Sequence, residues 1–184
     1  MKGAFAATAA VDTVEFTPVA ARDLPMIADW IARAHWQEWW GDPDTEIGYI
    51  RDMIEGRDGT RPFIFHVDGE ATGYIQVWDV GPHQTEQWAV HHPWLMALPI
   101  DAIGVDLSIG PDEKLSQGIG SAVLKAFAQA LVNDGHRTII IDPDLDNARA
   151  IRAYFKAGFR PMPNLDGMKH DVLIMQFQLD ADQP

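Results

Sequence analysis

The stretch from residue 103 to residue 133 constrains the fold of this chain more than any other. Its first residues alternate between apolar and polar side chains, which is typical of a strand; the apolar members are Ile103, Val105, Leu107 and Ile109. After a turn with two glycines, apolar residues recur at every fourth position, as in a helix: Ile119, Val123, Phe127 and Leu131. Asn133-Asp134-Gly135 ends this helix. A strand, a glycine turn and a helix in this order indicate an α/β fold.

Patterns elsewhere in the chain predict a sheet with mixed strand directions. Asp68-Gly69 separates two alternating segments and favours a hairpin. Strands are predicted at residues 14–18, 61–67, 72–79, 103–109, 138–141 and 170–179. Helices are predicted at residues 24 to about 34, 45–54, about 118–133 and 147–157, with Asp23 as a cap of the first, and residues 81–99 as a loop. We therefore expect one α/β (α+β) domain at 13–180, with a mostly antiparallel twisted sheet, about four flanking helices and a flexible tail at 1–12.

Composition narrows the possible functions. The chain has 184 residues and a formal net charge of −13, without a run of Lys or Arg. This argues against nucleic-acid binding and favours a cationic ligand, although acidic proteins are also common for reasons of solubility. The absence of cysteine excludes disulfides, thiolate metal sites and an acyl-cysteine intermediate, and it suits a reducing compartment. With no apolar stretch of membrane-spanning length, we expect a cytoplasmic protein that binds no membrane.

The glycine turn can bind an anion. Gly118 and Gly120 allow a ligand to approach the backbone, and the first N–H groups of the following helix lack intrahelical partners. Such a helix start binds phosphate or pyrophosphate, and Lys114 is near in sequence. The alternative is that the glycines serve only a tight turn. The pattern matches neither the dinucleotide-binding motif nor a P-loop.

The run from Asn147 to Phe159 is the most specific in the chain. Asn147 can cap a helix that Gly158 ends, and we predict that its inward face carries Ala150, Ile151, Tyr154 and Phe155. Taken alone, Tyr154 can be an ordinary core residue.

Together, the glycine turn and the pattern Asn-x-x-Ala-x-x-x-Tyr-x-x-x-Gly-Phe resemble the GNAT superfamily of acetyl-CoA-dependent N-acetyltransferases, over roughly residues 14–179. The resemblance sharpens towards the aminoglycoside 6'-N-acetyltransferases in five segments: Glu38-Trp39-Trp40-Gly41, Gly73-Tyr74-Ile75-Gln76, Gly104-Val105-Asp106, Asp142-Pro143 and Asn147 to Phe159. The sequence departs from these relatives in a less basic turn at Leu115 and Gln117, and in a loop at residues 88–94 without acidic side chains.

The resemblance implies acetyl-CoA as cosubstrate and no metal. In the family the turn holds the pyrophosphate of coenzyme A (CoA), the preceding strand pairs with its pantetheine arm, and the helix tyrosine protonates the departing thiolate. The residues implied in CoA binding are Leu107, Ser108, Ile109, Leu115, Ser116, Gln117, Gly118, Ile119, Gly120, Ser121, Asn147, Ala150 and Tyr154.

The acceptor implied is a small molecule with a primary amine. An alkylammonium must lose a proton before it attacks, and a neighbouring carboxylate can both anchor it and accept that proton. We predict Asp106, in mid-strand, as this base, Tyr154 as the acid and Asp142 as a second anchor. The alternatives are a structural carboxylate for Asp106 and an Asp-Pro turn for Asp142. The residues predicted to contact the acceptor are Trp39, Trp40, Gln76, Asp106, Asp142 and Asp171, with ordinary packing as the alternative for the two tryptophans.

Other functions remain open at this point. A related branch acylates hydroxylated amines or lysine during siderophore synthesis, but tends to carry His at the position of Asp106. Polyamine or protein acceptors, or a domain that binds CoA without catalysis, are further alternatives. His83, His91 and His92 lack the spacing of a metal site. We expect a monomer or a homodimer.

Overall fold

The computed structural model describes residues 13–165 and 171–178, and its first three strands pair in sequence order. Strand β1 (Val14–Pro18) pairs antiparallel with β2 (Arg61–Val67), with Phe16 opposite Phe65. Asp68 and Gly69, with φ of 52° and 82°, form the hairpin turn to β3 (Glu70–Asp79). The predicted bounds of β1 and β2 are confirmed, and β3 begins two residues earlier than predicted.

Seven strands of the described residues pair in the order β1-β2-β3-β4-β5-β7-β6. The later ones are β4 (Ile103–Ile109), β5 (Ile139–Ile141), β6 (Phe159–Pro161) and β7 (Met175–Phe177). Strands β4 and β5 are parallel, whereas β1–β2, β2–β3, β5–β7 and β6–β7 are antiparallel. This confirms the mixed, mostly antiparallel sheet.

The chain separates into two compact units, which are described one at a time. Unit 1 contains the residues up to Val77 and the segment Leu107–Val123; unit 2 contains Trp78–Asp106 and the residues from Leu124 onward. Strands β3 and β4 and helix α5 (Ile119–Asn133) each continue from one unit into the other. The predicted helix at about 118–133 is confirmed.

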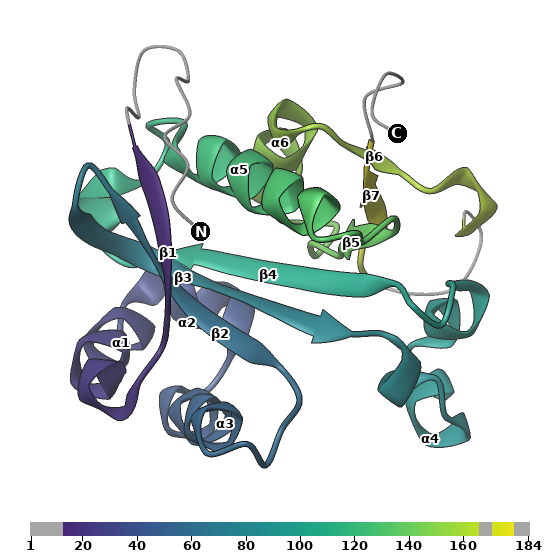
Figure 1. Ribbon diagram of the computed structural model, residues 1–184, viewed down its shortest axis with the longest axis horizontal. Coiled ribbons are helices and arrows are strands. Elements are labelled where there is room, and N and C mark those ends of the chain that lie inside the picture. The colour runs from purple at the N-terminus through teal and green to yellow at the C-terminus, as the bar shows by residue number, and fades with distance from the viewer. Residues whose placement is uncertain (1–12, 166–170, 179–184) are drawn as a thin grey trace. The chain divides into compact units, whose positions relative to one another are not determined.

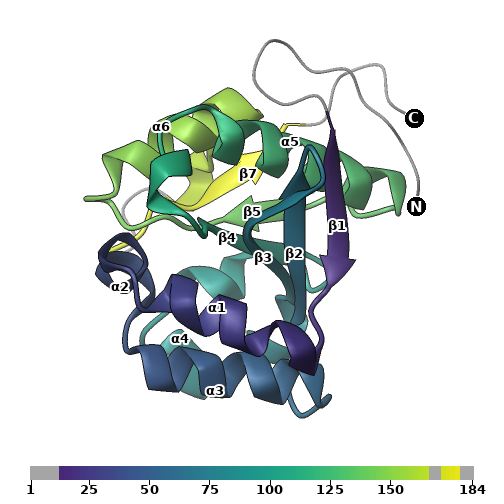
Figure 2. The same ribbon diagram turned by 90° about the vertical axis from the view of Figure 1, so that its left-hand side faces the viewer.

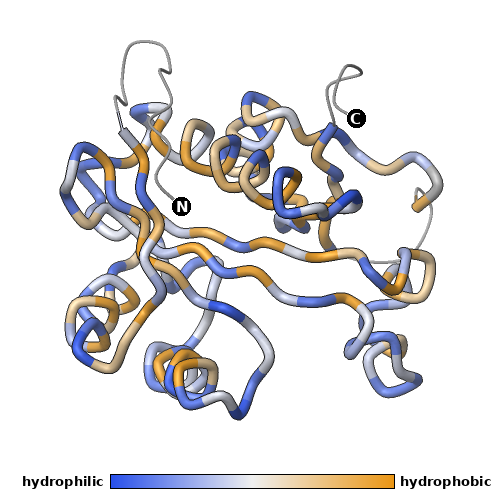
Figure 3. Tube along the Cα trace, in the orientation of Figure 1, coloured by the Kyte–Doolittle hydropathy of each residue, from blue (hydrophilic) through white to orange (hydrophobic). Residues whose placement is uncertain are grey.

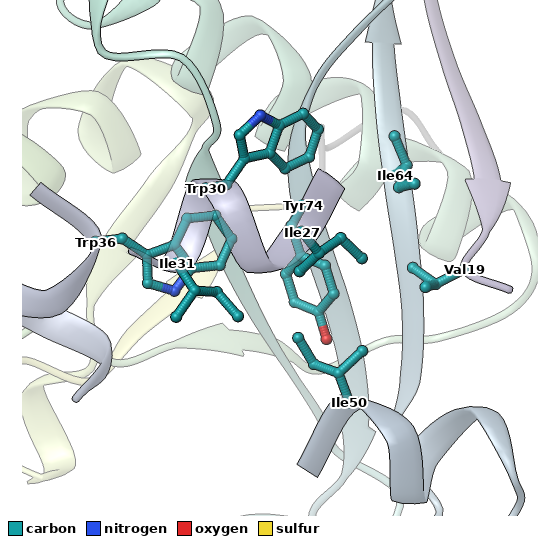
Figure 4. Close-up of a cluster of buried hydrophobic side chains, with 8 residues drawn as sticks. All are labelled: Val19, Ile27, Trp30, Ile31, Trp36, Ile50, Ile64 and Tyr74. Atoms are coloured by element: carbon teal, nitrogen blue, oxygen red, sulfur yellow. The ribbon is translucent and has the colours of Figure 1, made fainter. Parts of the chain in front are cut away.

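In unit 1, helices α1 (Leu24–Ile31), α2 (Ala34–Trp40) and α3 (Pro43–Ile54) lie on one side of β1, β2 and β3 (Figure 1). Figure 2 shows α1 and α3 side by side, and Figure 3 shows that each mixes hydrophobic and hydrophilic segments, as helices with one face on a sheet do. Their apolar faces form a core with the strands, in which the Tyr74 ring lies among isoleucines of α1 and α3 (Figure 4). The buried members of this core are Val19, Ile27, Trp30, Ile31, Trp36, Ile50, Ile64 and Tyr74.

The helices of unit 1 differ in part from the prediction. The first one ends at Ile31, and α2 was not predicted. Asp23 does not cap α1 with its side chain, because its Oδ2 accepts the N–H of Ala20 at 2.9 Å instead. Helix α3 begins at Pro43 because the preceding Asp42 caps it, accepting the N–H of Thr45 at 3.0 Å.

In unit 2, the stretch predicted as a loop at 81–99 contains helix α4 (Glu86–Ala89) between two 3₁₀ turns, Gly81–His83 and Pro93–Ala97. Helix α6 (Ala148–Ala157) follows β5 and is confirmed with its predicted cap. A second core lies in this unit: Val80, Trp94, Leu95, Leu98, Ala102, Ile140, Leu165 and Ile174. Further 3₁₀ turns of the described residues are Ala21–Asp23, Asp112–Lys114 and Pro163–Leu165.

The last strand is shorter than predicted. Strand β7 begins at Met175 rather than 170 and pairs with β6, a three-residue strand that was not predicted. His170, Leu179 and the predicted tail at 1–12 lie outside the described residues. The described part contains six α-helices rather than about four. None of its helices is long and apolar enough to cross a membrane.

Candidate active site

Strand β4 carries Asp106 in a partly buried position of unit 2. The indole Nε1–H of Trp78, at the end of β3, donates a hydrogen bond of 3.1 Å to Asp106 Oδ2. Gly104 makes this possible, because a Cβ on that residue would overlap the indole ring of Trp78. Trp78 is not among the residues predicted from the sequence. The only sequence signal for this contact is Gly104, two residues before Asp106. That glycine indicates space for a side chain of β3 only once the pairing of β3 with β4 is known.

Two more ionisable side chains of unit 2 lie close enough to Asp106 to interact with its charge. Asp142 directly follows β5. Burial, and to a smaller extent the negative charge of Asp106, raise the pKa of its carboxyl well above the ordinary value. Tyr154 projects from α6, and burial, Asp106 and Asp142 together raise the pKa of its phenol, against a smaller opposite effect of Arg149. The three residues predicted for catalysis and anchoring are thus brought together in one unit.

This grouping is suited to proton transfer. Carboxyl groups that share a site resist ionising together, so one retains a proton at a pH where an ordinary aspartate is charged. A tyrosine with a raised pKa keeps its proton at neutral pH and can donate it. One unit therefore places a proton donor and a proton acceptor close together, and the catalytic role of these residues stays a prediction.

Helix α6 holds Tyr154 between two well-defined ends. Asn147 Oδ1 accepts the N–H of Ala150 at 3.0 Å, and Gly158 ends the helix with φ of 103°. The prediction for Phe155 is wrong: 39% of its surface is exposed, and the Arg160 guanidinium covers its ring at 5.5 Å. The inward stripe of this amphipathic helix is thus narrower than predicted, and Phe155 lies at its solvent edge.

In unit 1, the glycine turn has the backbone of an anion-binding loop. Ser116 and Gly118 have φ of 61° and 83°, and a Cβ on Gly118 would meet nothing within 4 Å. The Ser121 Oγ–H donates to the Gly118 carbonyl at 2.8 Å. Because α5 begins at Ile119, its first N–H groups have no intrahelical acceptor. Open space beside such donors fits a pyrophosphate.

Ion pairs fix the segment that leads into this turn. Lys114 Nζ lies 2.8 Å from Glu70 Oε2, and this contact raises the pKa of the lysine. Arg33 pairs with Asp112 and lies 3.8 Å from Glu113. Both cations are therefore paired with carboxylates, so the predicted anion site would depend mainly on hydrogen bonds from backbone N–H groups.

The residues predicted to contact CoA lie in two groups. Leu107, Ser108 and Ile109 end β4, and the segment 115–121 forms the turn and the start of α5, all in unit 1. Asn147, Ala150 and Tyr154 lie on α6 in unit 2, with Asn147 engaged as the helix cap. Their contact with CoA stays a prediction.

Three of the predicted acceptor residues lie in unit 1. Trp40 belongs to the edge of the core, with its ring 5.2 Å from Trp36 and 5.7 Å from Tyr74, and Trp39 is partly buried. Gln76 Oε1 accepts the Tyr74 hydroxyl at 2.7 Å. Their role at the acceptor stays a prediction.

Asp171 is exposed and precedes β7 by four residues, rather than lying in the last strand. Its backbone carbonyl accepts the N–H of Leu145 at 2.9 Å. Its role at the acceptor also stays a prediction.

Aromatic and imidazole rings of unit 2 follow one another from the end of β3 through the segment 81–97. Successive ring centroids are 5.3, 4.9, 5.6 and 6.1 Å apart, in the order Trp78, His83, Trp88, His92 and Trp94. Burial and the neighbouring His91 lower the pKa of His92. The residues that the structure describes contain no group of three or more His, Cys, Asp or Glu placed to hold a metal ion.

Comparison with known proteins gives concordant results. Residues 19–167 match the family described as an acetyltransferase (GNAT) domain. An aminoglycoside N(6')-acetyltransferase type 1 from Klebsiella pneumoniae is 30% identical over 156 residues, which cover 80% of this chain and 74% of that protein. A relative of the same name from Serratia marcescens matches to the same extent.

Solved structures show the same similarity. The aminoglycoside acetyltransferase AAC(6')-Ib in complex with coenzyme A is 26% identical, with a TM-score of 0.73 over 89% of this chain and 94% of that one. The same enzyme with paromomycin and acetyl-CoA has a TM-score of 0.74 over 90% of this chain and 93% of that one. An aminoglycoside N(6')-acetyltransferase from Legionella pneumophila, 19% identical with a TM-score of 0.69 over 89% and 91% of the two chains, shares the fold.

Proposed function

Because the chain belongs to the GNAT family of acetyltransferases, we propose that it moves the acetyl group of acetyl-CoA onto the 6'-amine of an aminoglycoside. The observation that carries this proposal is the grouping of Asp142 and Tyr154 near Asp106 of β4, whose negative charge raises the pKa of both neighbours. The curated relatives named as aminoglycoside N(6')-acetyltransferases, and the neighbour solved with paromomycin and acetyl-CoA, support this acceptor and donor.

The donor would be held by the backbone. The N–H groups at the start of α5 and the open space at Gly118 suit its pyrophosphate, and the edge of β4 at Leu107–Ile109 suits its pantetheine arm. Acetyl-CoA supplies a thioester that an amine can attack.

The acceptor would be bound through its positive charges. Asp106 anchors the ammonium group and accepts its proton, and Asp142 forms a second contact to the cation. The net charge of −13 favours the approach of a polycation to the protein as a whole.

The acetyl transfer would be direct, within a ternary complex, since the chain has no cysteine that could carry the acyl group. The amine nitrogen, after losing its proton to Asp106, forms a bond to the carbonyl carbon of the thioester. The carbon–sulfur bond breaks, and Tyr154 donates its phenolic proton to the leaving sulfur. The second proton that the nitrogen loses as the amide forms returns to the phenolate of Tyr154. The products are an amide and CoA with a free thiol.

The test is thiol release from acetyl-CoA with a panel of aminoglycosides, followed by mass spectrometry of the product to locate the acetyl group. We expect turnover of kanamycin and tobramycin with acetylation at the 6'-amine. Loss of a general acid or base typically costs about 10²–10⁴-fold in rate, so Asp106→Asn and Tyr154→Phe should each lose activity within that range, Asp106→Asn more.

The matched control is Asp134→Asn, which removes an exposed carboxylate just after α5 and should leave turnover unchanged. CoA binding without turnover of any amine would instead support a non-catalytic module. Acylation of hydroxylamines alone would support the siderophore alternative, and full activity of Asp106→Asn would remove the proposed base.

A further inference from the structure

We propose that Trp78 is a positioning residue for Asp106: its indole N–H fixes the orientation of the carboxylate and keeps the charge of the aspartate pair on Asp106. This inference rests on the proposed function, in which Asp106 is the base. Trp78 itself touches neither substrate in this proposal and acts only through the aspartate.

The hydrogen bond has an unambiguous direction. An indole nitrogen can donate a hydrogen bond but cannot accept one, so in the 3.1 Å contact the Trp78 N–H donates to Asp106 Oδ2. Such a donor stabilises an ionised carboxylate more than a protonated one, because a bond to a charged acceptor is about twice as strong as a neutral one. Both side chains are partly buried, which limits competition from water.

The fold provides a dedicated position for the indole. On one side, the absence of a side chain at Gly104 allows the ring to lie against β4, since a Cβ there would overlap the ring atoms Cε2, Cζ2 and Nε1. On another side, the His83 ring packs against the indole, with ring centroids 5.3 Å apart and an angle of 77° between the ring planes. His83 Nδ1 in turn lies 2.9 Å from the Asp79 carbonyl oxygen. The indole is therefore held against Asp106 from two elements.

The electrostatic surroundings give this contact a consequence. The charge of Asp106 acts on Asp142 and Tyr154, Arg149 acts on Tyr154 with the opposite sign, and the His83 ring contacts Trp78. Burial and the negative charge of Asp106 raise the pKa of Asp142 and outweigh the opposite effect of a hydrogen bond from the Asp142 backbone N–H, so these effects favour the charge on Asp106. The indole N–H acts on Asp106, which makes Asp106 the proton acceptor and leaves the proton on Asp142.

Trp78→Phe tests this by removing the N–H while keeping an aromatic ring. We expect kcat/KM for the amine to fall roughly 10- to 100-fold, which is the usual effect of losing a hydrogen bond to a charged group. The KM for acetyl-CoA should be unchanged. The acidic limb of the pH profile of kcat/KM should move to higher pH. The matched control is Trp94→Phe in the same unit: among the described residues, the buried Trp94 Nε1 has no hydrogen-bond partner. That variant should leave the acidic limb in place.

Gly104→Ala provides an independent perturbation. The added methyl group should displace the indole and reproduce the shift of the acidic limb with Trp78 still present. In a Trp78→Ala background, where no ring remains to displace, Gly104→Ala should add little further loss. Equal losses in both backgrounds would mean that Gly104 acts independently of Trp78 and would contradict the proposal.

A measurement without substrates separates this inference from the proposed function. The indole ¹⁵N–¹H signal of Trp78, assigned by its absence from Trp78→Phe, should shift with pH in a step that Asp106→Asn abolishes. If this step is present but no aminoglycoside is turned over, the contact is real and the proposed acceptor is wrong. If the signal does not titrate, and Trp78→Phe has the pH profile of Trp94→Phe, the positioning role is overturned even in an active enzyme.

Discussion

Among single residues, the carboxyl of Asp142 has the clearest energetic consequence. A negative charge helps a residue to bind a cationic substrate. In the substrate-free protein, however, two carboxylates held close together repel each other and lower the stability of the fold. Burial and Asp106 both disfavour the charged form of Asp142, which is why its pKa is raised. If Asp142 has the proposed anchoring role, this arrangement exchanges stability for substrate binding, as is common at functional sites.

The stability of the substrate-free protein should therefore respond to Asp142→Asn. Because the pKa is raised in the folded state, the unfolded chain ionises first as the pH rises above the ordinary value of 3.8. Folding stability then falls with rising pH until Asp142 ionises in the folded protein as well. At mildly alkaline pH, Asp142→Asn should therefore raise the free energy of unfolding, because the variant has no carboxyl to ionise in the buried site.

Urea unfolding of both proteins across the acidic to alkaline range measures this effect. The gain should shrink as the pH approaches the ordinary value of an aspartate and vanish below it. Asp134→Asn serves as the exposed control and should change little at any pH. An Asp142→Asn variant that is less stable than the parent at alkaline pH would show that the carboxylate is favourably paired instead.

The sequence could predict Asp106, Asp142 and Tyr154 because each stands in a run with its own local signal, but it could not predict Trp78. The indole meets an aspartate 28 positions away, and that contact depends on how two strands pair. Likewise, nothing local reveals that Lys114 is paired with Glu70, which is 44 positions away. Local patterns identify side chains that are able to bind or react, whereas contacts with other elements decide what these side chains do.

Among the elements, those with strong terminal signals were predicted best. Strand β2 has a hairpin turn at its end, and α6 has Asn147 and Gly158 at its ends. Helix α2 was missed because its sequence, Ala-His-Trp-Gln-Glu-Trp-Trp, has no aliphatic periodicity; aromatic packing of Trp36 and Trp40 on Tyr74 stabilises it. Strand β6 was missed because its three residues have meaning only beside β7.

Helix α6 offers a test of capping at the element that carries Tyr154. Asn147→Ala removes the acceptor for the Ala150 N–H and should lower the free energy of unfolding by about 0.5–2 kcal/mol, the usual cost of losing such a cap. Asn147→Ser, which keeps an acceptor at the same position, should recover most of this loss. Urea unfolding without CoA isolates the structural effect from the predicted role of Asn147 in cofactor binding.

Equal stability of the parent and Asn147→Ala would mean that packing alone holds the start of α6. Equal losses for the alanine and serine variants would point to a contact other than the cap.

At the scale of the whole molecule, excess negative charge acts on every ligand, whatever its local contacts. The chain has 27 Asp and Glu residues but only 14 Lys and Arg residues. The family match at 19–167 includes parts of both compact units. Such a field attracts polycations and repels the phosphates of acetyl-CoA. In the proposed function, the acceptor would therefore benefit from the charge of the whole protein, whereas the donor would depend on the N–H groups at the start of α5.

Salt should separate these two contributions. Screening shortens the reach of the field from about 10 Å at 0.1 M ionic strength to about 3 Å at 1 M. Over this range we expect KM for an aminoglycoside to rise severalfold, while KM for acetyl-CoA does not rise in parallel, because weaker repulsion by the field offsets weaker attraction by the N–H groups. Initial rates with each substrate varied in turn, at constant pH, measure both constants. Parallel rises would instead mean that local contacts bind both substrates and that the net charge has no part in acceptor binding.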